Sequence, residues 1–145
     1  MIKNQTRMAC LLVAMLSALA LAAESAKSDK PASAPATRPA GRRDVGVEEF
    51  EKLWKDKKGT VLDVRTAKEF EAGHIPGAVN IDVNSPEFEK KVKELDKDKT
   101  YLVHCASGVR SVRACEKMNR MDFKQLINLQ GGIKAWEKAG KPVEK

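Results

Sequence analysis

The sequence predicts an α/β domain with a mainly parallel sheet that helices cover on both faces. From residue 47 onwards, short β-branched runs alternate with helical apolar patterns, and the connections are brief, which is typical of parallel sheets with crossover helices. Cys105 ends one strand-like run, and a helical pattern begins directly after it. Because binding crevices in such sheets lie beyond the carboxyl ends of the strands, a reactive side chain is expected at that place.

The N-terminal part of the chain differs from the rest. Residues 1–23 begin with a basic stretch, continue as an apolar run and end in small residues, which is the order of a secretory signal peptide and predicts a periplasmic protein. A retained membrane anchor is the alternative, although the apolar run falls short of a span of about 20 residues. Residues 24–43 are rich in Ala and Pro and are expected to be a flexible linker. One domain is expected over residues 44–145.

The first half of the domain predicts two helices and two strands around a turn. Apolar residues at helical spacing indicate a helix at 47–54, and the β-branched run at 60–64 indicates a strand. Thr66 suits the N-cap of a short helix that ends near residue 72. Two glycines and a proline at 73–77 predict a turn. A second short strand is expected at 78–81.

The second half of the domain continues the alternation. Ser85 and Pro86 are typical of a helix start, and an apolar stripe extends that helix to Leu95. The remaining elements are expected in the order strand 100–104, helix 108–120, strand 125–129 and helix 131–139.

Charge and motif spacing narrow the function classes. The chain has a formal net charge of +7, but residues 44–145 hold 20 Lys and Arg against 18 Asp and Glu. A nucleic-acid role would need a concentrated basic face and a recognisable motif, and neither is visible. No cluster has metal-ligand spacing, and no glycine fingerprint for a phosphate cofactor is present. We therefore expect neither a metal nor a cofactor.

Two cysteines remain after the predicted signal peptide. Cys115 lies in step with Val112 and Met118 on the helix, and we interpret it as a small buried hydrophobe. A disulfide with Cys105 is not expected, because the loop would have to fold back over two helical turns. Cys10 lies at the start of the apolar run and not at its end, so we do not interpret it as a lipid-attachment site.

Cys105 is the candidate nucleophile. It lies on a tight turn from strand to helix, where backbone N–H groups and the positive end of the helix can face the sulfur. Arg110 and Arg113 follow within two turns and favour the anionic form. Such surroundings lower a thiol pKa and make the thiolate available.

The length of the loop points to sulfur chemistry. Four residues separate Cys105 from Arg110, whereas phosphotyrosine-type phosphatases place five residues between Cys and Arg. The shorter loop suits a single added sulfur atom. The candidate site residues of this loop are Cys105, Ala106, Ser107, Gly108, Val109 and Arg110. Arg110 either contacts an anionic substrate or braces the loop through a carboxylate, and the sequence leaves both interpretations open.

Other polar residues have structural interpretations beside functional ones. Arg65 follows a strand and could reach the same crevice, but a structural pair with Glu69 or Glu71 is favoured. Asp63 is interpreted as a hydrogen-bonded structural carboxylate.

His74 in the turn is expected to form a hydrogen bond with nearby backbone. The side chain of His104 is expected on the face opposite to Cys105.

Three motifs together resemble the single-domain rhodanese (thiosulfate sulfurtransferase) family. They are LDVR at 62–65 with GHIPGAVNI at 73–81, YLVHCASGVRS at 101–111, and LQGGIKAW at 129–136 followed by GKPV. The resemblance implies a five-stranded parallel sheet and sulfur transfer from thiosulfate or a similar donor to cyanide or a thiol. It further implies that Cys105 accepts the sulfur, that N–H groups of residues 106–110 form its cradle, and that Arg110 closes the loop.

Two other functions remain as alternatives. A sulfur-carrier or interaction module would hold a persulfide on Cys105 and pass it only to a protein partner. A small phosphatase or arsenate reductase on the same fold is the third hypothesis, and the six-residue loop argues against it. The expected partners are a small-molecule sulfur donor and acceptor, with a protein acceptor as a further option, and the protein is expected to be a monomer.

Overall fold

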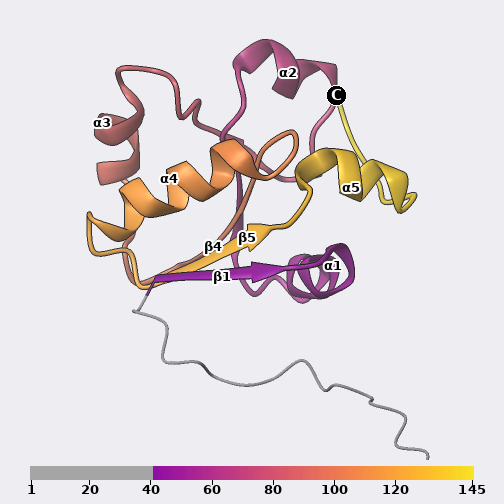
Figure 1. The fold of residues 1–145 in the computed structure, drawn as a ribbon, viewed down its shortest axis with the longest axis horizontal. Coiled ribbons are helices and arrows are strands. Elements are labelled where there is room, and N and C mark those ends of the chain that lie inside the picture. Colours follow the sequence, from indigo (N-terminus) through magenta and orange to yellow (C-terminus); the bar gives the residue numbers. More distant parts are fainter. Residues whose placement is uncertain (1–40) are drawn as a thin grey trace, which may run out of the picture. The chain divides into compact units, whose positions relative to one another are not determined.

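The computed structural model describes residues 41–145 (Figure 1). Five strands form one parallel sheet in the order β1-β5-β4-β2-β3. The strands are β1 Gly41–Val45, β2 Thr60–Asp63, β3 Val79–Asn80, β4 Thr100–His104 and β5 Gln125–Leu129. The helices are α1 Val47–Lys55, α2 Ala67–Ala72, α3 Phe88–Lys93, α4 Val109–Asn119 and α5 Gly132–Lys138. The predicted α/β fold with a five-stranded parallel sheet is therefore confirmed.

Strand β1 corrects the predicted domain boundary. The sequence pattern places residues 41–43 in the linker at 24–43, but in the structure they belong to β1 and pair with residues 125–127 of β5. β1 is an edge strand with one neighbour, and only Val45 in it is buried, so it lacks the apolar run by which a strand is identified. The predicted signal peptide and the rest of the linker lie outside the described residues.

Helices cover both faces of the sheet and divide the core into two parts. One face packs against α3 and α4, which contribute Phe88 and Met118. The other face packs against α1 and α5, which contribute Phe50 and Trp136 with their rings in an edge-to-face contact. Figure 1 shows α4 and α1 on opposite sides of the strands. The sheet is therefore the middle layer of three, with a hydrophobic core on each side.

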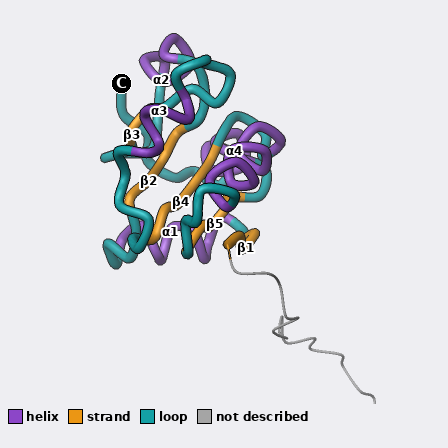
Figure 2. The backbone as a smooth tube through the Cα atoms, turned by 90° about the vertical axis from the view of Figure 1, so that its left-hand side faces the viewer, coloured by secondary structure: helices purple, strands orange, loops and turns teal. Residues whose placement is uncertain are grey.

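The parallel register places the C-terminal ends of β2, β4 and β5 at the same end of the sheet. Asp63 at the end of β2 pairs with His104 at the end of β4, and Val103 pairs with Asn128 near the end of β5. Figure 2 shows β2, β4 and β5 side by side. The segments that follow these three strands therefore start at the same end of the sheet, as expected for a site beyond the carboxyl ends of the strands.

Some elements are shorter than the sequence pattern predicted. Helix α3 begins at Phe88 instead of Ser85, because residues 85–87 form a turn in which the Phe88 N–H donates to the carbonyl of Ser85. Strand β3 spans two residues only. Within residues 41–145, none of the helices combines the length and the apolar character needed to cross a membrane.

Candidate active site

Cys105 lies directly after β4, at the start of the loop that leads into α4. The backbone N–H of Gly108 donates to Cys105 Sγ at 3.1 Å, and the Ser111 hydroxyl lies 3.5 Å from the same sulfur. Cys105 is fully buried, whereas Ser107 and Val109 in the same loop are exposed. The sulfur therefore lies at the bottom of the loop, beneath an exposed rim.

The loop favours the anionic form of this thiol. Burial raises the pKa of Cys105, but hydrogen bonding to the Ser111 hydroxyl and to the N–H groups of Ser111, Gly108 and Ser107 lowers it by more. The net result is a pKa below the ordinary cysteine value. A thiolate is the nucleophilic form of cysteine, so the loop supplies a reactive sulfur.

The carbonyl groups of the first two loop residues, Cys105 and Ala106, bond the first turn of α5. The carbonyl of Cys105 accepts from the Ile133 N–H at 2.8 Å, and the carbonyl of Ala106 accepts from the Lys134 N–H at 3.1 Å. With these acceptors turned towards α5, N–H groups are left to face the sulfur. This arrangement makes a concavity that favours a negative charge.

Gly132 is required for the contact between the loop and α5. Its φ of +59° is in the left-handed region, and a Cβ atom there would lie 2.4 Å from the Cys105 carbonyl oxygen and 2.6 Å from the Ala106 carbonyl carbon. Both of these atoms belong to the loop backbone, which cannot move aside without changing the N–H geometry around Sγ.

We expect Gly132→Ala to destabilise the protein by about 2 kcal/mol or more, from backbone strain and overpacking together. Gly140→Ala is the matched control, because its φ is +69° but no atom lies within 4 Å of the added Cβ. Strain alone should cost about 1 kcal/mol there. Urea unfolding of both variants measures the difference, and equal losses would contradict the steric role of Gly132.

Arg110 braces the loop against α2. Its two terminal nitrogens donate to the two carboxylate oxygens of Glu69, at 2.8 and 2.6 Å. The carboxylate of Glu69 also accepts from the N–H and hydroxyl of Thr66, which caps α2 in return. The hydrogen bonds from Arg110 lower the pKa of Glu69 to about 2. Of the two interpretations of Arg110, this is the bracing arrangement.

The structure corrects the predicted partner of Arg65. Neither Glu69 nor Glu71 pairs with it. Its guanidinium lies 2.6 Å from Asp63 Oδ2 and donates to the carbonyl of Gly73 at 2.7 Å, with both charged side chains buried. Arg65 and Asp63 are two residues apart at the end of β2, so their side chains lie on the same side, while Glu69 is held by Thr66 and Arg110. The structural interpretation of Asp63 is confirmed.

The two histidines have structural surroundings. His104 is fully buried, and its Nε2 lies 3.7 Å from Asp63 Oδ2. Burial lowers the pKa of His104 to about 4, so the ring is neutral at pH 7. Nδ1 of His74 lies 2.9 Å from the carbonyl oxygen of Phe70, and the two rings stack. The predicted backbone contact of His74 is confirmed.

Cys115 behaves as the sequence predicted. Among the described residues, it and Cys105 are both free, and Cys115 is fully buried in the core between the sheet and α4. Burial raises the pKa of Cys115 to about 12. At neutral pH it is therefore a protonated thiol, in contrast to Cys105, whose pKa is lowered.

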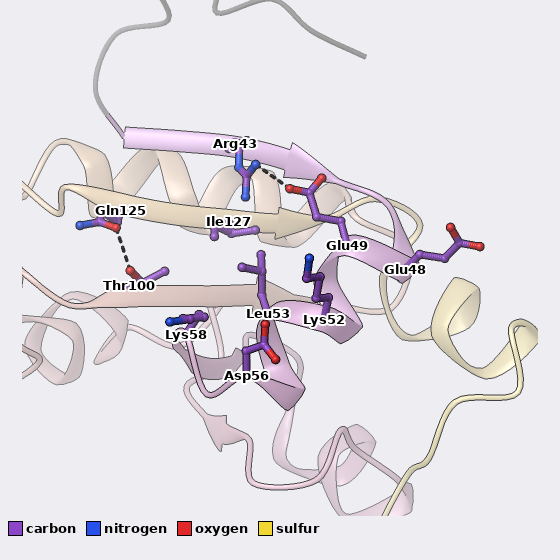
Figure 3. Close-up of a pocket in the computed structure, with 10 residues that line it drawn as sticks. All are labelled: Arg43, Glu48, Glu49, Lys52, Leu53, Asp56, Lys58, Thr100, Gln125 and Ile127. Atoms are coloured by element: carbon purple, nitrogen blue, oxygen red, sulfur yellow. Dashed lines mark hydrogen bonds and ion pairs between the residues drawn. The ribbon is translucent and has the colours of Figure 1, made fainter. Parts of the chain in front are cut away.

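A surface pocket reaches the N-terminal ends of β4 and β5, whereas Cys105 follows the C-terminal end of β4. Its volume is about 810 Å³, and Thr100 and Gln125, the first residues of β4 and β5, line it and bond each other at 2.9 Å. Figure 3 shows charged side chains around a floor of Leu53 and Ile127. The other lining residues are Arg43, Glu48, Glu49, Lys52, Asp56 and Lys58. Cys105 follows the last residue of β4, so this pocket is separate from the candidate nucleophile.

Sequence reasoning missed three residues that shape the site. Glu69 was assigned to the wrong arginine, although the Thr66-x-x-Glu69 spacing is a capping-box signal that fixes this carboxylate. Ser111 and Gly132 lie within the quoted motifs, but the sequence pattern assigns neither of them a role in the site. The adjacent glycines at 131 and 132, directly after a strand, are the signal that could have indicated a close backbone approach.

Comparison with known proteins gives consistent matches. The family profile described as "Rhodanese-like domain" matches residues 46–139. The "Putative sulfurtransferase YtwF" of Bacillus subtilis is 39% identical over 92 residues, which cover 63% of this chain and 86% of that protein. The "Putative sulfur carrier protein YrkF" of the same organism is 36% identical over 94 residues, which cover 64% of this chain and only 50% of that protein.

A solved structure shares the fold over nearly its whole length. The crystal structure of a rhodanese-related protein from Thermoplasma volcanium is 34% identical to this chain, with a TM-score of 0.63. The similarity covers 70% of this chain and 97% of that one. The similarity in sequence and the similarity in structure therefore concern the same domain.

Proposed function

Because the chain belongs to the rhodanese-like domain family, we propose that it transfers a sulfane sulfur from thiosulfate or a similar donor to cyanide or a thiol, through a persulfide on Cys105. Its relatives include sulfurtransferases and a sulfur carrier. The observation that carries the proposal is the buried Cys105 sulfur with a lowered pKa, in a loop that directs N–H groups towards it. The identity of the donor and the acceptor is the finer part of the proposal.

The reaction has two half-reactions. In the first, the Cys105 thiolate attacks the outer sulfur of thiosulfate, the bond between the two thiosulfate sulfurs breaks, and sulfite leaves with that electron pair. In the second, a lone pair of cyanide or of a thiolate attacks the outer sulfur of the persulfide. The bond between this sulfur and Sγ breaks, and its electron pair returns to Sγ. This is covalent catalysis by an activated cysteine.

The loop suits an added sulfur atom better than a phosphoryl group. Backbone N–H groups can stabilise the negative outer sulfur of a persulfide, as dipoles do for other developing anions. Both arms of Arg110 are held by Glu69, so this guanidinium is not free to clamp phosphoryl oxygens. These contacts favour sulfur transfer over the phosphatase or arsenate reductase alternative.

A carrier function is the second candidate. Val109 stands on the rim of the loop with 75% of its surface exposed, a large apolar side chain that a protein acceptor could cover, and YrkF is named a sulfur carrier. Slow discharge to cyanide and to small thiols, beside fast transfer to one protein thiol, would identify a carrier. Rapid turnover with small acceptors would instead support the enzyme.

The proposed location is the periplasm, on the basis of the signal-like residues 1–23. Expression of the full chain followed by separation of periplasm, cytoplasm and membrane tests this. Recovery of a shortened chain in the periplasm supports export with cleavage. Recovery of the full-length chain in the membrane fraction would support the retained anchor instead.

The test of the proposed function is a mass measurement. After incubation with thiosulfate and removal of excess reagent, the protein should carry an adduct of about 32 Da, one sulfur atom, at Cys105. Cyanide should then remove this mass and form thiocyanate. An unchanged protein mass after exposure to thiosulfate and to a low-molecular-weight persulfide would refute the proposal.

A further inference from the structure

Ser111 lies beside the reacting sulfur, on the first turn of α4. Its side chain is fully buried. The hydroxyl lies 3.5 Å from Cys105 Sγ and 3.0 Å from the carbonyl oxygen of Gly108, and it is oriented to donate to either. A hydroxyl has one proton, so it can donate to only one of these acceptors at a time.

The Gly108 carbonyl does not depend on Ser111. It also accepts a hydrogen bond from the N–H of Val112 at 3.3 Å. When the Ser111 proton turns towards Sγ, the carbonyl oxygen therefore keeps a donor. The Ser111 hydroxyl can therefore rotate to donate to Sγ when Sγ is negatively charged, and the Gly108 carbonyl oxygen still has a hydrogen-bond donor.

We propose that Ser111 is a catalytic hydrogen-bond donor to Sγ, which stabilises Cys105 as the leaving thiolate when sulfur passes to the acceptor. This inference rests on the proposed sulfur transfer. In the persulfide the negative charge is on the outer sulfur, which the backbone N–H groups can stabilise. As the acceptor's lone pair bonds the outer sulfur, the electron pair of the breaking bond moves to Sγ. The Ser111 hydroxyl keeps its proton and strengthens its hydrogen bond to this growing charge.

The two half-reactions should therefore depend on Ser111 differently. Discharge creates charge on Sγ, so the hydroxyl is worth more in its transition state than in the persulfide. Loading removes charge from Sγ, so the hydroxyl gives no such advantage once the thiolate is formed. A merely structural role would slow both half-reactions by the same factor.

Three other polar side chains near the loop, those of Arg110, His104 and Cys115, are not placed to donate a proton or a hydrogen bond to Sγ. Arg110 is paired with Glu69. His104, on β4, is neutral because burial lowers its pKa to about 4. Cys115, on α4, is protonated because burial raises its pKa to about 12. Among residues 41–145, Ser111 is the residue whose side chain lies within hydrogen-bond distance of the Cys105 sulfur, at 3.5 Å.

The test compares both half-reactions in Ser111→Ala, with Ser111→Thr as the variant that keeps the hydroxyl. Loading is followed as sulfite release in a single turnover with thiosulfate, at a pH where the ultraviolet absorbance of the thiolate shows full ionisation in each variant. Discharge is followed as thiocyanate formation when the persulfide form meets cyanide. Ser85→Ala, which removes a hydroxyl from the turn before α3, is the remote control.

In Ser111→Ala, we expect discharge to slow by roughly tenfold or more, the usual weight of a hydrogen bond to a charged group. Loading of the thiolate should stay within about twofold, and the thiolate titration should move to higher pH by about one unit. Ser111→Thr should restore discharge to within about threefold of the wild type.

Three outcomes would overturn the inference. Wild-type discharge in Ser111→Ala, an equal slowing of both half-reactions, or the same loss in the Ala and Thr variants would each do so. If the wild-type protein takes up no sulfur at all, the proposed function fails first. Normal wild-type loading and discharge beside an unaffected Ser111→Ala variant would remove only the role of Ser111.

Discussion

Replacement of Cys105 by Ala is expected to lower sulfur transfer at least about a thousandfold, the scale on which loss of a covalent nucleophile acts. The sulfur of Cys105 is the one that the loop N–H groups face, and its pKa is lowered. Without it, no persulfide can form, so both thiocyanate production and the adduct of about 32 Da should disappear. A steady-state assay with thiosulfate and cyanide, together with intact mass, measures both effects.

The matched control is Cys115→Ala. Cys115 is buried in the core, and burial raises its pKa to about 12, so its thiol is not ionised at neutral pH. Transfer by this variant should stay within about twofold of the wild type. If transfer persisted in Cys105→Ala and was lost only when Cys115 was also replaced, Cys105 would not be the nucleophile.

The pH dependence of loading has a definite sign. Only the thiolate attacks the donor, so the loading rate should fall as the pH drops below the Cys105 pKa and level off above it. Because that pKa is lowered, the fall should lie at lower pH than the iodoacetamide reaction of a free cysteine in the same buffers. A loading rate that keeps rising up to the ordinary cysteine pKa would contradict the lowered value.

The sequence pattern predicted the fold well where apolar residues decide it. In β2, β4 and β5, every residue after the first is buried, and the helices α1, α4 and α5 show their apolar faces in the sequence. Strand β1 could not be predicted in this way. Its residues Arg42 and Arg43 are in a strand because their backbone pairs with β5, and they are not buried. An edge strand needs only backbone hydrogen bonds to one neighbour.

The candidate site was predictable in its nucleophile and less so in its supporting contacts. The placement of Cys105 follows from a local pattern, a strand end followed by Ser, Gly and a helix. The pair between Arg110 and Glu69 joins residues 41 positions apart, and two carboxylates were within reach of Arg65 in the sequence. Such pairings depend on how α2 and the loop are packed, which no local spacing specifies.

Loss of one partner of the buried pair of Asp63 and Arg65 is expected to destabilise the protein strongly, because it leaves a buried charge unpaired. Oδ1 of Asp63 accepts from the Arg65 N–H at 3.0 Å, and Oδ2 accepts from its guanidinium at 2.6 Å. Asp63→Ala leaves the guanidinium buried with only the Gly73 carbonyl as a partner. Breaking one side of a buried ion pair costs about 3–5 kcal/mol, so this variant should lose that much in urea unfolding.

A solvent-exposed pair serves as the control for this prediction. Arg43 and Glu49 lie 2.6 Å apart with about half of each side chain exposed, so Glu49→Ala should cost no more than about 1 kcal/mol. The double variant Asp63→Ala with Arg65→Met should be more stable than Asp63→Ala alone, because the second change removes the unpaired buried charge. If Asp63→Ala cost no more than Glu49→Ala, water or a rearranged side chain would have to satisfy Arg65. Arg65 donates to the Gly73 carbonyl at 2.7 Å, and in that case this contact would hold without the charge of Asp63.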